Sequence, residues 1–212
     1  MDHLRHISLP PRDEPLVIPW PQERGIGFPS FLEPEEWRNF IYSFNLHPGI
    51  PLQIIAKYHR AQKLYYLAWI DFDLIKAGEL IALIALEMAL KQRYGTRPDL
   101  VEVILPHEER WPSEKQKTAA RKRKADFHLL LNYMVQKDGV TNEALPSVKR
   151  FSSNVIDRLT GKAKPGIAEI RNSQAHGEPF DGMLQSGLIE LVCDLIHYVY
   201  RDLIHDVELE HR

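Results

Sequence analysis

The sequence predicts an all-α protein: a bundle of about five to six helices that follows an extended, proline-rich arm. Apolar residues recur every three or four positions in several separate segments, which is the spacing of one face of an α-helix. No segment alternates apolar and polar residues convincingly enough to predict a paired sheet. Six of the 15 prolines lie among the first 30 residues. Because proline fixes φ and lacks an amide donor, this stretch resists both helix and central strand.

The first predicted region, residues 1–48, joins this arm to a short helix over residues 34–44. Pro34 suits the first helical turn, and the two glutamates that follow it favour the positive end of the helix dipole. The sequence His-Pro-Gly at 47–49 ends the pattern. We therefore expect an arm that is ordered only where its apolar side chains find a groove.

The second region, residues 49–212, holds the predicted helices of the main domain. Apolar positions with helical spacing fall within residues 52–69, 80–94, 127–135, 147–159 and 184–203. The segment 70–75 either continues the first of these helices or forms a turn. The 80–94 segment is the most hydrophobic, which places it at the centre of the core, and Gly95 is its stop signal.

Composition limits what the protein can bind. The hydrophobic share of 44% and the charged share of 26% are those of an ordinary globular protein. A formal net charge of −2 provides no overall attraction to nucleic acid or anionic membrane, so any such attraction must come from a local patch. The single cysteine, Cys193, has no partner for an internal disulfide and is predicted to be buried. No segment has the length of a membrane span, and we expect a soluble, cytoplasmic protein.

One basic run could supply such a patch. Residues 114–126 carry six cations and two acidic residues, a local charge of about +4. The candidate RNA-binding residues in this run are Lys115, Lys117, Arg121, Lys122, Arg123 and Lys124. These side chains would hold an RNA backbone through phosphate contacts. The alternative is that they form the solvated start of a helix.

Arg171, Asn172 and His176 are candidate catalytic residues, and they lie between two apolar helical segments. Arg carries a permanent charge on a planar fork that fits a phosphate, and His moves protons near neutral pH. Together they suit phosphodiester cleavage without a metal. His176 would deprotonate the ribose 2′-OH or protonate the leaving 5′-oxygen, and Arg171 would stabilise the phosphorane. Asn172 would hydrogen-bond a phosphate or hold the His ring.

Helix geometry leaves this interpretation open. Two positions five apart lie about 140° apart around a helix axis, so a bend at Gly177 would be needed to turn both side chains into one cleft. The plain alternative is that Arg171 is solvated or in a salt bridge and that His176 caps the end of a helix. No His pair has metal-ligand spacing, so neither a metal nor a cofactor is predicted.

The sequence Arg-Asn-x-x-x-His, just before the last apolar segment, resembles the Arg-x(4–6)-His signature of the HEPN superfamily (higher eukaryotes and prokaryotes nucleotide-binding). The segment 77–91 resembles the second core helix of that family, which often carries Glu-x-x-x-Lys, here Glu87 and Lys91. The resemblance covers about residues 52–205. It implies a helical bundle that dimerises, so that two motifs form one composite site. Many members are metal-independent endoribonucleases that act as toxins or defence effectors, and toxins pair with an antitoxin protein.

Carried across by position, the resemblance makes Arg171 and His176 the catalytic pair and Asn172 their polar companion. Glu87 and Lys91 would support the site. The chain departs from one toxin branch, which has Tyr two residues after the His, because Glu178 occupies that position here. Two other hypotheses stay open: a non-catalytic HEPN-like module that binds nucleotide, RNA or protein, and a helical interaction protein with no role in nucleic-acid binding.

Overall fold

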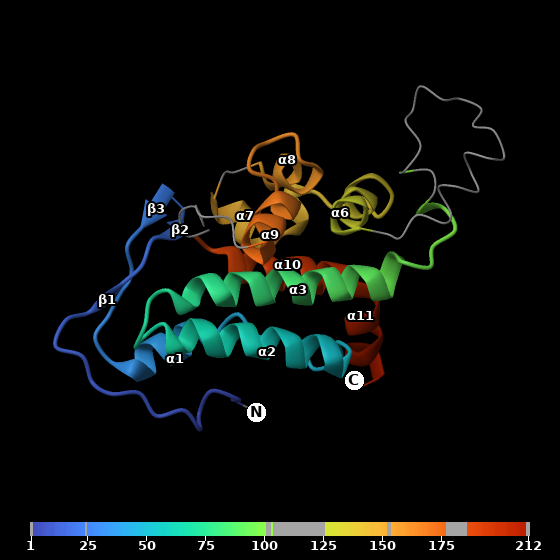
Figure 1. Cartoon of the computed structure of the whole chain (residues 1–212). Helices are drawn as coiled ribbons and strands as arrows, with labels where there is room; N and C mark the ends of the chain where they lie inside the picture. Colours follow the sequence, from blue (N-terminus) through green and yellow to red (C-terminus); the bar gives the residue numbers. More distant parts are fainter. Residues whose placement is uncertain are drawn as a thin grey trace.

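The computed structural model describes residues 2–23, 25–100, 103, 126–151, 154–176 and 186–210 (Figure 1). Within these ranges the chain forms nine α-helices, one short 3₁₀ helix and four very short strands, so the predicted all-α class is confirmed. One helix, α1 (Pro34–Tyr42), belongs to the arm, and the others follow residue 49. The described part therefore holds more helices than the five or six predicted for the bundle.

The arm contains an antiparallel ribbon, made of two separate pairs of short strands, that was not predicted. Its strands are β1 (Leu16–Val17), β2 (Trp20–Gln22), β3 (Gly25–Gly27) and β4 (Ser30–Phe31), with β1 paired to β4 and β2 to β3. Ile18 donates its backbone N–H across the ribbon to Pro29. Because inward and outward amides alternate along a strand, Pro19 and Pro21 occupy outward positions, where no N–H is needed. A proline-rich segment can therefore form this ribbon.

Two long helices form the base of the molecule in Figure 1: α2 (Leu52–Leu67) and α3 (Leu74–Tyr94). Residues 68–73 separate them, so the turn option is confirmed for residues 70–73, whereas Leu74 and Ile75 begin α3. Gly78 lets the two helices approach closely, because a Cβ there would lie 2.6 Å from the ring of Tyr65. As predicted, α3 is central: Leu83, Leu86 and Leu90 are fully buried.

The second half of the chain covers α3 with shorter elements. They are α6 (Phe127–Gln136), the 3₁₀ helix η1 (Asn142–Ala144), α7 (Pro146–Phe151), α8 (Val155–Thr160), α9 (Ile167–His176), α10 (Leu188–Val199) and α11 (Arg201–Glu210). In Figure 1, α10 runs along α3, and α6, α8 and α9 lie above it. This arrangement brings α3, α6 and α9 together.

Two predicted helices are each divided. The 147–159 segment forms α7 and α8, because Asn154 leaves helical geometry and its side chain caps α8 by accepting the amide of Asp157 at 3.2 Å. The segment predicted over 184–203 forms α10 and α11, which meet at Tyr200, where φ is −108° and ψ is 15°. Residues 184 and 185 lie outside the described ranges. Apolar periodicity continues through both breaks, so the pattern alone could not reveal them.

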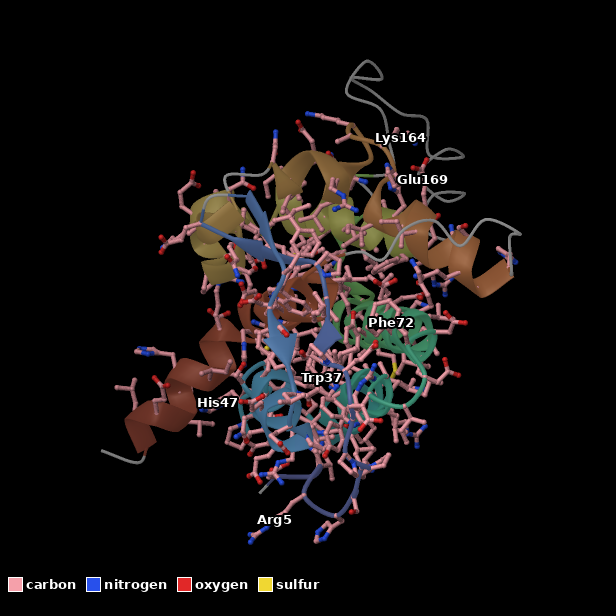
Figure 2. The ribbon with its side chains drawn as sticks, turned by 90° about the vertical axis from the view of Figure 1, so that its left-hand side faces the viewer. Arg5, Trp37, His47, Phe72, Lys164 and Glu169 are labelled. Carbon is pink, nitrogen blue, oxygen red and sulfur yellow. The ribbon has the colours of Figure 1, made fainter. Side chains whose placement is uncertain are left out.

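One buried cluster links the arm to the helices. Figure 2 shows Trp37 of α1 in the interior, whereas Arg5, near the start of the arm, points away from the molecule. Trp20 of β2 is buried and donates its indole N–H to the buried carboxylate of Glu190 in α10 at 3.0 Å. Cys193 is buried as predicted, and burial raises the pKa of its thiol to about 12. None of the described helices combines the length and the apolar character needed to cross a membrane.

Candidate functional site

Four of the five predicted catalytic and supporting residues line one cavity, of about 320 Å³, between α3, α6 and α9. We call it the Arg171 cavity, and its lining residues are Glu87, Lys91, Asp126, Phe127, His128, Arg171 and Asn172. The two motifs that carried the family resemblance, one on α3 and one on α9, thus contribute to the same cavity.

Glu87 is the contact between these motifs. Its side chain, in a residue only 6% exposed, accepts a hydrogen bond from Nη2 of Arg171 at 2.6 Å and one from Nζ of Lys91 at 2.5 Å. One carboxylate therefore holds two cations at the cavity wall. A buried carboxylate needs such partners, because removal of an ionised group from water costs several kcal/mol. Arg171 is neither fully solvated nor isolated, and its salt bridge fixes it in place.

Asn172 completes the environment of the guanidinium. Its Oδ1 accepts a hydrogen bond from Nη1 of Arg171 at 2.9 Å. The Nε of Arg171 is buried and has no hydrogen-bond partner among the described residues. Glu87 and Asn172 thus engage two of the five guanidinium N–H groups, and Asn172 holds the Arg rather than the His ring.

His176 is not brought into the Arg171 cavity by its own chain. It is the last residue of α9, its side chain is exposed, and it does not line the cavity. Arg171 and His176 share one helix, so they are separated by about 7.5 Å along the axis and about 140° around it. The bend considered at Gly177, the residue Glu178 and the basic residues at 115, 117 and 121–124 lie outside the described ranges.

Two cavity residues were missed from the sequence: Asp126 and His128, both at the start of α6. Asp126 caps this helix by accepting the amide of Leu129 at 2.8 Å. His128 follows two residues later and faces the cavity. The Asp-x-x start of a helix was a usable capping signal, but nothing in the sequence placed that helix beside α9.

A second polar contact between α3 and α9 was also missed. The carboxylate of Glu79, which is fully buried, accepts a hydrogen bond from Nε2 of Gln174 at 2.8 Å and lies 3.4 Å from Nζ of Lys76. Glu79 and Glu87 are eight positions apart, so they share one face of α3. Two acids on one face of the most apolar helix were the signal for this contact, which joins α9 to α3 at a second point beside the Arg171–Glu87 ion pair.

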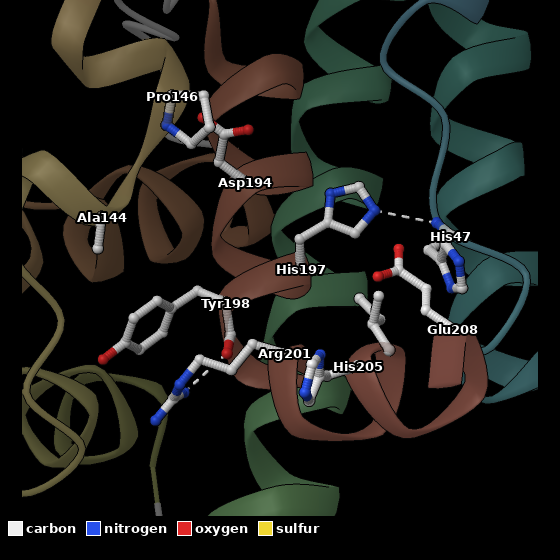
Figure 3. Close-up of a pocket in the computed structure, with 10 residues that line it drawn as sticks. His47, Ala144, Pro146, Asp194, His197, Tyr198, Arg201, His205 and Glu208 are labelled. Carbon is white, nitrogen blue, oxygen red and sulfur yellow. Dashed lines mark hydrogen bonds between the residues drawn. The ribbon is translucent and has the colours of Figure 1, made fainter. Parts of the chain in front are cut away.

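A larger cavity of about 560 Å³ lies beside α10 and α11, and three histidines line it: His47, His197 and His205 (Figure 3). His197 accepts the backbone N–H of His47 at 2.9 Å, and burial lowers its pKa. Arg201, also at this cavity, is held by both oxygens of Asp138. Within the described ranges, no three His, Cys, Asp or Glu side chains are grouped so that they could hold a metal ion.

Comparisons with protein-family models, with curated proteins and with solved structures found no match to this chain. A function must therefore be argued from the residues themselves. In the Arg171 cavity, charged side chains from α3, α6 and α9 line one open volume.

Proposed function

We propose that the protein is a metal-independent endoribonuclease of HEPN type that acts through the Arg171 cavity. The observation that carries the proposal is the contact between Arg171 of the Arg-x4-His motif and Glu87 of the Glu-x-x-x-Lys helix, at 2.6 Å. The two residues are 84 positions apart in the sequence, and each belongs to a motif that the sequence alone indicates. Their convergence supports a shared role, which is why the proposal is preferred to a chance spacing.

The proposed reaction is cleavage of RNA by its own 2′-hydroxyl. The 2′-oxygen attacks phosphorus, the bond to the 5′-oxygen breaks, and the products end in a 2′,3′-cyclic phosphate and a 5′-hydroxyl. Arg171 and Lys91 stabilise the negative charge that grows on the phosphorane, and Asn172 orients the guanidinium. His176 serves as general acid or base. Glu87 supports the site by fixing both cations.

A second copy of the chain completes this site. Because His176 projects away from the cavity of its own chain, the proposal requires His176 of a second copy to reach Arg171 across a two-fold axis. The predicted homodimer thereby becomes a chemical requirement. Such a dimer would hold two sites, one at each Arg171 cavity, rather than the single composite site that the family resemblance implies. The basic run at 115–124 would hold the RNA backbone, and a toxin role, with an antitoxin protein as partner, is part of the same hypothesis.

The test is RNA cleavage by the purified chain and its variants. Arg171→Ala should lower the rate about 100-fold or more, which is the loss typical of removing one transition-state donor. His176→Ala should cause a similar loss. The matched controls are Arg60→Ala and His6→Ala, since both side chains are exposed and neither lines the cavity. Wild-type rates in both Arg171→Ala and His176→Ala would refute the proposal.

One observation favours a different function, a non-catalytic HEPN-like module that binds nucleotide, RNA or protein. Two of the guanidinium nitrogens of Arg171 are already engaged by Glu87 and Asn172, which leaves less of the charge for a phosphate. In that case RNA binding in a mobility-shift assay would be the same for wild type and Arg171→Ala, and no cleavage would accompany it.

A further inference from the structure

His128 is a histidine that lies in the Arg171 cavity, and it comes from α6 rather than from the Arg-x4-His motif. The buried ring of Phe127 and the Asp126 cap fix the first turn of α6, and the side chain of His128 projects from that turn. The cavity of a single chain therefore already holds an imidazole together with Arg171, even though His176 is outside it.

The ring of His128 has a defined orientation. Nδ2 of Asn132 lies 3.1 Å from its Nε2 and also donates to the backbone oxygen of His128 at 2.9 Å. With this arrangement Nε2 accepts, so neutral His128 carries its proton on Nδ1. A flip of the Asn132 amide presents its oxygen to the imidazolium, so Asn132 can orient both protonation states.

The ring of His128 lies directly beside Gly161. Gly161 ends α8 with a left-handed φ of 75°, and a Cβ at this position would lie 3.1 Å from Cε1 of His128. The ring is therefore positioned from two sides, by Asn132 along its own helix and by the backbone of Gly161. Such positioning from separate elements is what a proton-transfer group requires, because a small displacement of such a group lowers the rate.

Cleavage by the 2′-hydroxyl requires two proton transfers, whereas in the arrangement proposed above each of the two sites receives a single His176, that of the other chain. We propose that His128 is the general acid of the site; this rests on the ribonuclease function proposed above. His176 of the second copy takes the proton of the 2′-OH as the 2′-oxygen bonds to phosphorus. The bond from phosphorus to the 5′-oxygen breaks, and imidazolium His128 gives its proton to that oxygen. Exchange with water then restores both histidines.

The experiment changes the leaving group. A short RNA that contains the cleaved linkage is prepared with its 5′-oxygen at that linkage replaced by sulfur. A thiolate leaves without protonation, so loss of the acid no longer matters. On ordinary RNA, His128→Ala should lower kcat about 100-fold or more, the contribution typical of a general acid. On the sulfur-containing RNA, the same variant should react within about 10-fold of wild type.

Three controls make the result decisive. His6→Ala, an exposed histidine outside the cavity, should match wild type on both substrates. Arg171→Ala should stay impaired on the sulfur-containing RNA, because its role is to stabilise charge. Thermal unfolding of His128→Ala should match that of wild type.

Other outcomes overturn the assignment. An unchanged rate for His128→Ala on ordinary RNA would mean that His128 is only a surface partner of Asn132. Equal loss on both substrates would mean that His128 is not the acid. Suppose that wild type cleaves RNA and Arg171→Ala does not. Each of these two results then refutes only the role of His128 as general acid, and the ribonuclease proposal stands. If wild type cleaves neither substrate, the ribonuclease proposal itself fails, and the role of His128 with it.

Discussion

Glu87 is the residue on which the geometry of the Arg171 cavity depends. It is almost fully buried in the central helix, and its two oxygens hold Lys91 and Arg171 at 2.5 and 2.6 Å. A buried carboxylate with two cationic partners adds little net stability. Removal of one of the three groups is nevertheless costly, because a charge of opposite sign is left without its partner. The role of Glu87 is therefore to place the cations rather than to transfer protons.

Replacement of Glu87 should therefore lower stability as well as activity. Glu87→Ala should lower the free energy of unfolding by about 2 kcal/mol, below the 3–5 kcal/mol of a fully buried pair because Lys91 and Arg171 are partly exposed. Glu87→Gln, which keeps a hydrogen-bond acceptor, should cost less. Urea unfolding measures both variants, with exposed Glu23→Ala as control. A change below about 0.5 kcal/mol in Glu87→Ala would show that the contact is unimportant.

At the scale of elements, sequence periodicity predicted most helices but not their breaks. The bounds of α1, α2 and α6 follow the predicted segments closely, since apolar spacing and chain-breaking residues both mark them. The division at Asn154 depends on a side-chain cap, and the division at Tyr200 on a single residue with non-helical backbone angles. Neither event interrupts the apolar pattern, so neither could be predicted from it.

Only those residues of the candidate site that belong to local sequence patterns could be predicted. Arg171, Asn172, Glu87 and Lys91 belong to local patterns, and these patterns were visible in the sequence. Asp126 and His128 have no such pattern, and they reach the cavity only because α6 packs against α3 and α9. Contacts between helices distant in sequence are decided by tertiary packing, which a single sequence does not reveal.

The start of the arm is another element with a testable property. The ring of His3 stacks on that of His59 in α2, with centroids 3.6 Å apart, and both ring nitrogens of His3 are buried without a hydrogen-bond partner among the described residues. Burial, and then the neighbouring His59, lower the pKa of His3 to about 4, although Asp2 opposes the shift and Lys63 adds to it. Burial also lowers the pKa of His59, whose Nε2 lies 3.2 Å from Asn45.

The arm should therefore weaken in acid. A histidine with a depressed folded-state pKa binds more protons when unfolded, so its stabilising contact is complete above pH 6.5 and is lost as the pH falls towards 4. After correction for the intrinsic exchange rate, which itself falls with pH, amide hydrogen exchange at residues 4–9 should accelerate as the pH is lowered from 7.5 to 5. His3→Phe, which keeps the stacked ring, should reduce this acceleration, whereas His6→Phe should not. Equal acceleration in both variants would contradict the proposed role of His3.

At the scale of the whole molecule, the proposed site spans two chains. Each site would use Arg171 of one copy and His176 of the other, because α9 directs the two side chains to different faces. The single chain would then be inactive although it is folded. This arrangement makes activity depend on dimer formation, which in turn depends on protein concentration.

Mixed dimers test this arrangement. Arg171→Ala and His176→Ala should each be inactive alone, but a refolded equal mixture should recover about one quarter of the wild-type rate. Half of the dimers would be mixed, and each mixed dimer would have one intact site of its two. Analytical ultracentrifugation verifies that the variants dimerise. If the mixture stays inactive although mixed dimers form, Arg171 and His176 do not act across the interface.

The central claim, that the Arg171 cavity cleaves RNA with its own 2′-hydroxyl as nucleophile, is tested most directly by the chemical ends of the products. Wild-type protein incubated with RNA in EDTA should produce fragments with a 2′,3′-cyclic phosphate and a 5′-hydroxyl, identified by mass spectrometry. The Arg171→Ala preparation, purified in the same way, should produce none above background. Fragments with a 5′-phosphate, or the same cyclic ends from Arg171→Ala at an undiminished rate, would contradict the claim.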